Sequence, residues 1–366
     1  MLLLYIATVL LVLIGIYIIS KELKYDILWK FANVTFAAIL FYLLLFNVTS
    51  NSDWQIYEHM FLVENQRDLL FYFITIFVKH LGYEYPVVYK IHITLIGCGL
   101  IFFISRFSKN YLLIILTIFL MFFIVQISNQ IRYYLAFALF INSIYFLIVQ
   151  EKKKYFLLFA VLSILSHFSI LLLYLFLFFY YKFNLNKSIK ITLLYAVVFL
   201  AVILSIDTLA FFSRLEYFNA YLQEDAQSTL IGGLFNTLIW IFWIALVFFR
   251  NRYLSAYHSL ENDKKYQFLY KVSLFPIIFV PTGMFMIVFA SRYLMPFLIV
   301  WIIFFFYSMI YENNKQRVKT ILTFSFFVII TSFYYYILPQ FLFDEKIRVT
   351  QLMYIVMSNT SINFLF

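Results

Sequence analysis

Long apolar stretches alternate with short polar segments along almost the whole chain. A helix needs roughly 20 apolar residues to cross the hydrocarbon core of a bilayer. Ten stretches meet this length to within a few residues: 2–19, 31–48, 87–105, 111–128, 131–150, 191–212, 230–249, 268–290, 293–311 and 318–338. We therefore expect an all-α fold, a polytopic transmembrane helical bundle with about 10 full spans.

Two further apolar segments do not fit a simple crossing. Residues 69–81 are too few to cross, whereas residues 155–181 are too many for one crossing and too few for two. If both are re-entrant or short helical segments, most basic loops fall on one side of the membrane, as the positive-inside rule requires. The turn around His167 would then lie beside a cavity open to the outside, because non-helical backbone at membrane depth needs protein or water around it.

The distribution of basic residues also orients the chain. The lysines between the first two expected spans place that loop in the cytoplasm, so both termini are expected outside. The loops 49–68 and 213–229 and the tail 339–366 are then external. The cytoplasmic loops are short, so we expect residues 1–366 to form one integral membrane domain without a soluble catalytic part.

Composition supports a membrane protein and excludes several other classes. Hydrophobic residues make up 65% of the chain and charged residues 12%, against about 25% charged residues in soluble domains. The net charge is +10, but the basic residues lie in short loops between apolar spans, so we exclude nucleic-acid binding. One cysteine allows no intramolecular disulfide, and neither metal-ligand spacing nor a nucleotide motif is present, so we expect no cofactor.

Four arginines lie at the expected outer ends of helices, on the side that usually carries few basic residues. They are Arg67, Arg132, Arg214 and Arg292. Because the planar guanidinium group matches phosphate with two parallel hydrogen bonds, this pattern indicates a site for an anionic group. Asn129 falls roughly on the same helix face as Arg132. The alternative is that these arginines reach lipid phosphates or pair with acidic residues of the external loops.

Two residues are candidates for a general base. His167 lies near the middle of an apolar segment among serines, and Asp53 lies just outside the second expected span. Trp54 and Tyr57 follow Asp53, and their rings are suited to stacking on a sugar. Structural alternatives remain for each: a hydrogen-bonded histidine that holds the turn, or an aspartate that caps a short interfacial helix with aromatic residues at headgroup level.

Three stretches of the chain resemble the EpsG-type family of bacterial polysaccharide polymerases, which are similar in role to the Wzy O-antigen and capsule polymerases. They are Asp53-x3-Tyr57 with the segment 69–83, the sequence NQIRYYLA at 129–136 with Ser166-His167-Phe168-Ser169, and Ser291-Arg292-Tyr293-Leu294. The resemblance runs over most of residues 50–310. Tyr133 departs from the family pattern, in which glutamine is common after the arginine.

The resemblance implies a glycosyltransferase that polymerises polyprenyl-pyrophosphate-linked oligosaccharides at the outer face of the bacterial cytoplasmic (inner) membrane, in O-antigen, capsule or exopolysaccharide synthesis. Arg132 and Arg292 would hold the pyrophosphate, with Arg67 and Arg214 as further pyrophosphate-binding residues. His167 or Asp53 would take the proton of the acceptor hydroxyl, and Trp54, Tyr57 and Asn129 would contact the sugar. The partners would be the lipid-linked substrate, the bilayer and, in addition, a chain-length regulator. The alternatives are a flippase or other transporter of lipid-linked oligosaccharides, an acyltransferase or O-antigen ligase, and a scaffold for an export complex.

Overall fold

The computed structural model describes residues 26–48, 51–66, 68–182, 230–256, 260–285 and 290–334. Every regular element in this part of the chain is a helix, which confirms the all-α expectation there. The chain divides into two compact units, one of Met1–Leu171 with Glu312–Phe366 and one of Leu172–Tyr311. Whether the two units make up one membrane domain stays a prediction.

Five described helices are long and apolar enough to cross a membrane. They are Tyr85–Ser105, Leu112–Asn129, Ile131–Ile148, Gly232–Ser255 and Ala290–Tyr311. The chain is therefore a multi-pass helical membrane protein. The expected spans 2–19 and 191–212 lie outside the described residues, and the stretches 31–48, 268–290 and 318–338 are not among these five helices. The total of ten spans therefore stays a prediction.

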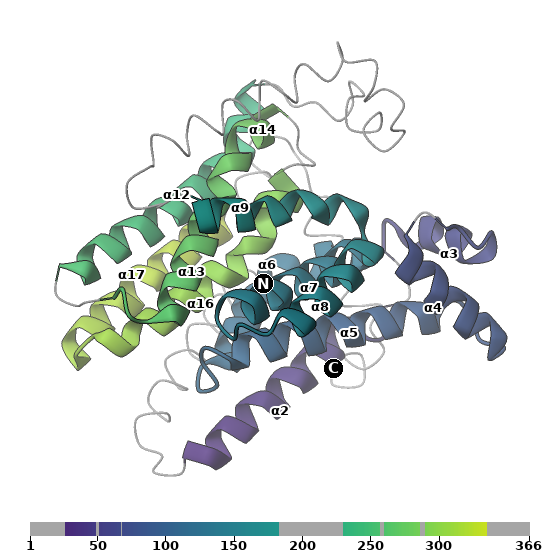
Figure 1. Cartoon of the computed structure of the whole chain (residues 1–366), viewed down its shortest axis with the longest axis horizontal. Helices are drawn as coiled ribbons and strands as arrows, with labels where there is room; N and C mark the ends of the chain where they lie inside the picture. The colour runs from purple at the N-terminus through teal and green to yellow at the C-terminus, as the bar shows by residue number, and fades with distance from the viewer. Residues whose placement is uncertain are drawn as a thin grey trace. The chain divides into compact units, whose positions relative to one another are not determined.

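The first unit consists of helices from the N-terminal half of the chain together with one late helix. They are α2 (Asp26–Leu45), α3 (Trp54–Leu62), α4 (Leu69–His80), α5 (Tyr85–Ser105), α6 (Leu112–Asn129), α7 (Ile131–Ile148), α8 (Lys153–Ser166) and α17 (Asn314–Ser332) (Figure 1). Pro86 lies in the first turn of α5, where its missing N–H costs nothing. Asn313 and Gln316 form a capping box that starts α17.

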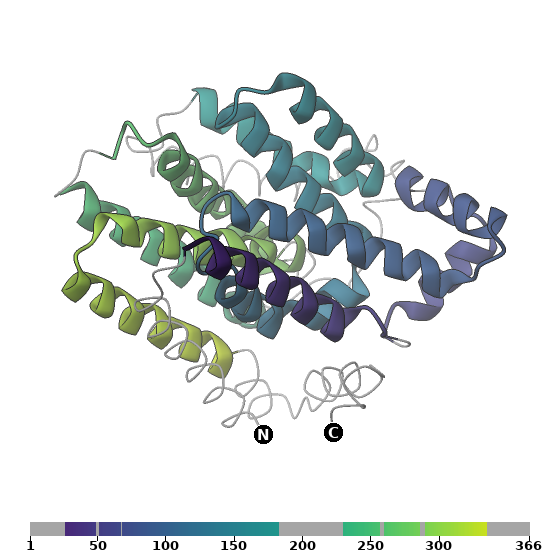
Figure 2. The same ribbon diagram turned by 90° about the horizontal axis from the view of Figure 1, so that it is seen from below.

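Small residues let α5 approach its neighbours closely. A Cβ atom placed on Gly97 would lie 2.8 Å from the buried ring of Phe41 on α2, which runs beside α5 (Figure 2). On the next face of α5, a Cβ atom on Gly99 would lie 3.1 Å from Cβ of Ala138 on α7. The side-chain amide of Asn142 closes this contact by donating to the carbonyl of Gly99 at 2.9 Å. Small residues and polar bridges are the usual means of packing helices in a bilayer, where the hydrophobic effect does not drive helix association.

Helices α7 and α8 form an antiparallel pair that ends at His167. Ser163 of α8 donates to the carbonyl of Ala136 at 2.7 Å, and Ser166 donates to that of Arg132 at 2.9 Å. The later residue of α8, Ser166, contacts the earlier residue of α7, Arg132, so the end of α8 lies beside the start of α7. His167 then adopts an extended backbone, and a 3-10 helix follows at Phe168–Tyr174. The predicted break in the segment 155–181 is confirmed, whereas its return to the outer side stays a prediction.

The second unit consists of one long helix, several shorter helices and the breaks between them. Its elements are α9 (Leu175–Lys182), α12 (Leu230–Ser255), α13 (Lys264–Leu274), η6 (Phe275–Phe279), α14 (Val280–Phe285), η7 (Ala290–Leu294), η8 (Met295–Phe297), α16 (Leu298–Ser308) and η9 (Met309–Tyr311). Pro276 lies in the first turn of the 3-10 segment η6, where the expected span 268–290 breaks. Trp301 of α16 stacks on Trp240 and Trp243 of α12, and its indole N–H donates to the carbonyl of Ser273 at 2.8 Å.

One carboxylate ties the start of α13 to the end of the last span of this unit. Asp263 caps α13 by accepting from the backbone N–H groups of Lys265 and Tyr266, and it also accepts from the hydroxyl groups of Tyr307 and Tyr311. Burial acts to raise the pKa of Asp263, but these hydrogen bonds favour the ionised form and together hold the pKa below its ordinary value.

Candidate functional site

Three helix ends bring a carboxylate, a guanidinium group and an imidazole together in the first unit. Asp68 directly precedes α4, Arg132 is the second residue of α7, and His167 directly follows α8. The pairing of α7 with α8 places Arg132 and His167 near each other, since Ser166, which precedes His167, donates a hydrogen bond to the carbonyl of Arg132. We call Asp68, Arg132 and His167 the polar cluster.

Asp68 joins the other two members through a single oxygen atom. Its Oδ2 accepts a hydrogen bond from Nη1 of Arg132 and lies 3.3 Å from Nδ1 of His167. The Asp68 side chain is 1% exposed, so these contacts lie away from bulk solvent. An ionised carboxylate can only accept hydrogen bonds, so Nδ1 of His167 is the donor in this contact. In the neutral imidazole Nε2 then carries the lone pair, which is the tautomer a general base requires.

Aromatic rings hold the guanidinium group of Arg132 in place. Its central carbon lies 5.0 Å from the ring centroid of Tyr57 on α3 and 5.7 Å from that of Phe71 on α4. Cation–π contacts of this kind are strongest where the cation is desolvated, and the Arg132 side chain is 15% exposed. The ring of His167 meets that of Tyr133 edge-on at 5.7 Å. The cluster is therefore built into packed helices rather than carried on a loop.

A second layer of buried polar groups lies on α5, on the side of Trp54 and Phe71. Tyr85, Tyr89 and His92 recur there at helical spacing, and each is at most 1% exposed. His92 donates from Nδ1 to the carbonyl of Val88 at 2.8 Å and packs against the ring of Phe71. The ring of Phe71 also contacts the guanidinium group of Arg132, so this layer adjoins the polar cluster.

Several of the residues that the sequence indicated lie at or near the polar cluster. Arg132 and His167 both contact Asp68, and Tyr57 lies beneath Arg132. Asn129 ends α6, three residues before Arg132. The assignment of these residues to substrate stays a prediction.

The other candidates have different surroundings. Asp53 precedes α3 and accepts from the hydroxyl of Ser52 at 3.3 Å. The ring of Trp54 packs on Tyr85 and Tyr89, at centroid distances of 4.8 and 5.3 Å. Arg292 lies in η7 of the second unit, whereas Arg67 and Arg214 lie outside the described residues.

Asp68 was not among the residues that the sequence indicated. Its position offers one signal, because an acidic residue immediately before an apolar segment lies where a charge needs a partner. Its partners, however, are 64 and 99 positions away, beyond the reach of any local pattern. Among the described residues, no group of three or more acidic, histidine or cysteine side chains is arranged to hold a metal ion.

These features define a multi-pass helical membrane protein with a buried carboxylate that links a guanidinium group to an imidazole. The model of the EpsG family matches residues 30–347, which is most of the chain, and the protein therefore belongs to the EpsG family. Membership of this family indicates a polysaccharide polymerase acting on lipid-linked substrates in a bilayer. No curated protein and no solved structure shows a significant match to the chain.

Proposed function

We propose that this protein is a glycosyltransferase that polymerises polyprenyl-pyrophosphate-linked oligosaccharide repeat units at the outer face of the bacterial cytoplasmic membrane. The observation that carries the proposal is the contact of one buried carboxylate, Asp68, with both Arg132 and His167 in a member of the EpsG family. The cluster offers a base and a cation at neighbouring positions, and both accelerate glycosyl transfer from a pyrophosphate.

The base in this proposal is His167. The hydroxyl oxygen of the acceptor sugar attacks the anomeric carbon of the donor, and its proton passes to Nε2 of His167. The bond between the anomeric carbon and the pyrophosphate oxygen breaks as the new glycosidic bond forms, and the pyrophosphate leaves with the electron pair. Asp68 holds the imidazole in the required tautomer and stabilises the imidazolium ion that results, the same division of labour as in catalytic triads.

Arg132 supplies the charge that the leaving group needs. A guanidinium group fixed between Tyr57 and Phe71 is already oriented, so little entropy is lost when it meets an anion. Preorganised donors aimed at developing negative charge are commonly worth factors of about 10²–10³ in rate. The role that the sequence indicated for Arg292, which lies in the second unit, stays a prediction.

The test is complementation of a strain that lacks the gene, with polymer length read on gels. His167→Ala and Arg132→Ala should abolish long polymer while membrane protein levels stay normal. Glu64→Gln is the matched control, because its carboxylate is 49% exposed and, among the described residues, pairs with Lys79 at 2.9 Å. Long polymer made by either cluster variant at the wild-type protein level would refute the assigned roles.

A further inference from the structure

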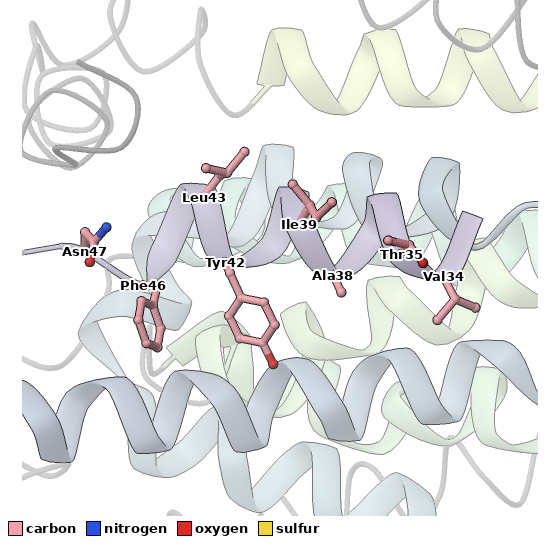
Figure 3. A pocket seen from close by; sticks show the side chains of 8 residues that line it. All are labelled: Val34, Thr35, Ala38, Ile39, Tyr42, Leu43, Phe46 and Asn47. Atoms are coloured by element: carbon pink, nitrogen blue, oxygen red, sulfur yellow. The ribbon is translucent and has the colours of Figure 1, made fainter. Parts of the chain in front are cut away.

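An open apolar groove runs along one side of α2 in the first unit. It extends from Val34 to Asn47, and Ala38, Tyr42 and Phe46 recur along it at intervals of four residues (Figure 3). At 1.5 Å per residue this is about 20 Å of helix, a large part of the roughly 30 Å hydrocarbon core. An apolar groove of this length along an apolar helix can bind a hydrocarbon chain.

A cation lies at one end of this groove. The ammonium group of Lys90, on α5, is 5.2 Å from the ring centroid of Phe46, next to Asn47. No carboxylate of the described residues lies within ion-pair distance of Lys90, although the residue belongs to a membrane span. A charge within a span is costly unless it has a partner or a purpose. An apolar groove that ends at an ammonium group matches a lipid with an anionic head.

A residue shortly after the end of the groove is hydrogen-bonded close to the start of α7, where Arg132 lies. Beyond Asn47, the side-chain amide of Asn51 donates to the carbonyl of Ser128 at 3.1 Å, and Ser128 lies four residues before Arg132. Lys90 faces Phe46 on α2, whereas His92, two residues later on α5, packs on Phe71, whose ring also contacts Arg132. The charged end of the groove and the polar cluster therefore flank α5 on two sides.

We infer that this groove, which we call the α2 groove, binds the isoprenoid chain of a lipid-linked substrate, with Lys90 pairing its phosphate. The inference rests on the proposed function, because joining two lipid-linked units requires two lipid sites near one reaction centre. The groove is one stripe of a single helix and suits one long chain, whereas a phospholipid carries two. A diphosphate head also carries more negative charge than a phosphodiester and pairs more strongly with a lysine.

The inference is tested by photolabelling the purified full chain in phosphatidylcholine nanodiscs. The probe is a long-chain polyprenyl diphosphate that carries a diazirine on its chain. We expect labelling of residues on α2, reduced about tenfold or more in Lys90→Gln through loss of a charge-assisted contact. Ala38→Trp, which fills the groove, should reduce labelling to a similar extent. The matched controls Lys79→Gln and Phe36→Trp, the latter on α2 but outside the groove lining, should label like the wild type.

Three results would overturn the inference. Equal labelling of wild type, Lys90→Gln and Ala38→Trp would mean that the groove is not the site. Equal displacement of the probe by phosphatidylglycerol would mark a general site for anionic lipids. A disulfide between a cysteine placed at position 39 and one placed within residues 2–19 would show that the chain's own N-terminal segment fills the groove.

A polymer assay on the same preparation separates this inference from the proposed function. If the wild type elongates lipid-linked repeat units but the α2 groove stays unlabelled, the inference fails and the proposed function stands. If the groove is labelled as described but no polymer forms, the proposed function fails, and with it the assignment of the bound lipid as a substrate.

Discussion

Replacing Asp68 with asparagine removes a carboxylate that is 1% exposed and whose Oδ2 atom meets both Arg132 and His167. The amide keeps the shape of the carboxylate but has one oxygen and one N–H₂ group. In the wild type, Nη1 of Arg132 and Nδ1 of His167 both meet one carboxylate oxygen. Even where the amide oxygen accepts from both groups, the negative charge that strengthens the two contacts is lost, which costs about 1.5–3 kcal/mol of stability. If the amide turns its N–H₂ group toward Nδ1 of His167, the imidazole adopts the tautomer that cannot act as a base from Nε2.

The expected effect on catalysis is larger than the effect on stability. Loss of an oriented general base commonly lowers a rate by factors of about 10²–10⁴. The assay compares the initial rate of chain elongation by purified wild type, Asp68→Asn, His167→Gln and the double variant, with thermal unfolding measured on the same samples. Glu64→Gln, which makes the same chemical change at an exposed ion pair, should stay within about twofold of the wild type.

The elongation rates of the single and double variants distinguish a role of Asp68 in catalysis from a purely structural role. If Asp68 acts through His167, the double variant should be no slower than the slower single variant, because residues that act as a unit are not additive. Two results would show that Asp68 does not act through His167. One is a double variant whose loss of rate is the product of the two single losses. The other is a rate for Asp68→Asn that equals the wild-type rate once the fraction of folded protein is corrected for.

Arg132, Gly97 and Asp263 each give a further prediction. Arg132→Lys keeps the charge but loses the planar group that packs on Tyr57, so elongation should fall at least about tenfold; normal elongation by this variant would contradict an anion-binding role. Gly97→Ala brings a Cβ atom against the ring of Phe41 and should lower the thermal stability by about 1–3 kcal/mol, whereas an unchanged melting temperature would show that α2 and α5 shift apart easily. Asp263→Asn should destabilise the protein by about 1–2 kcal/mol at pH 7. Because the pKa of Asp263 is lowered in the folded protein, its stabilising contribution is complete above the ordinary value near 3.8 and is lost as the pH falls through the folded-state pKa, so melting curves of wild type and variant should converge there.

Three spans of the first unit, α5, α6 and α7, were predictable from the sequence because each is a long uninterrupted apolar stretch. The expected stretches 87–105 and 131–150 correspond to α5 and α7, which the structure places at Tyr85–Ser105 and Ile131–Ile148. The break at His167 was also predictable, because the segment around it is too long for one crossing and contains a run of polar residues. In each case the signal lies within a few turns of helix.

The contacts of the polar cluster could not be predicted in the same way. Arg132 and His167 are recognisable as costly residues in apolar surroundings, but nothing local indicates that one carboxylate joins them. Trp54 illustrates the converse, since an aromatic ring beside a polar loop suits either a sugar or a neighbouring helix. In the structure it packs against Tyr85 and Tyr89. Its contact with a sugar stays a prediction.

The polymerase activity and the role of His167 are tested most directly by supplying the purified protein in proteoliposomes with polyprenyl-pyrophosphate-linked repeat units. We expect a ladder of products that grows by one repeat unit at a time, with polyprenyl pyrophosphate released at each step, and no ladder with His167→Ala. A single transfer without a ladder, translocation of intact substrate without new glycosidic bonds, or a normal ladder with His167→Ala would contradict this expectation.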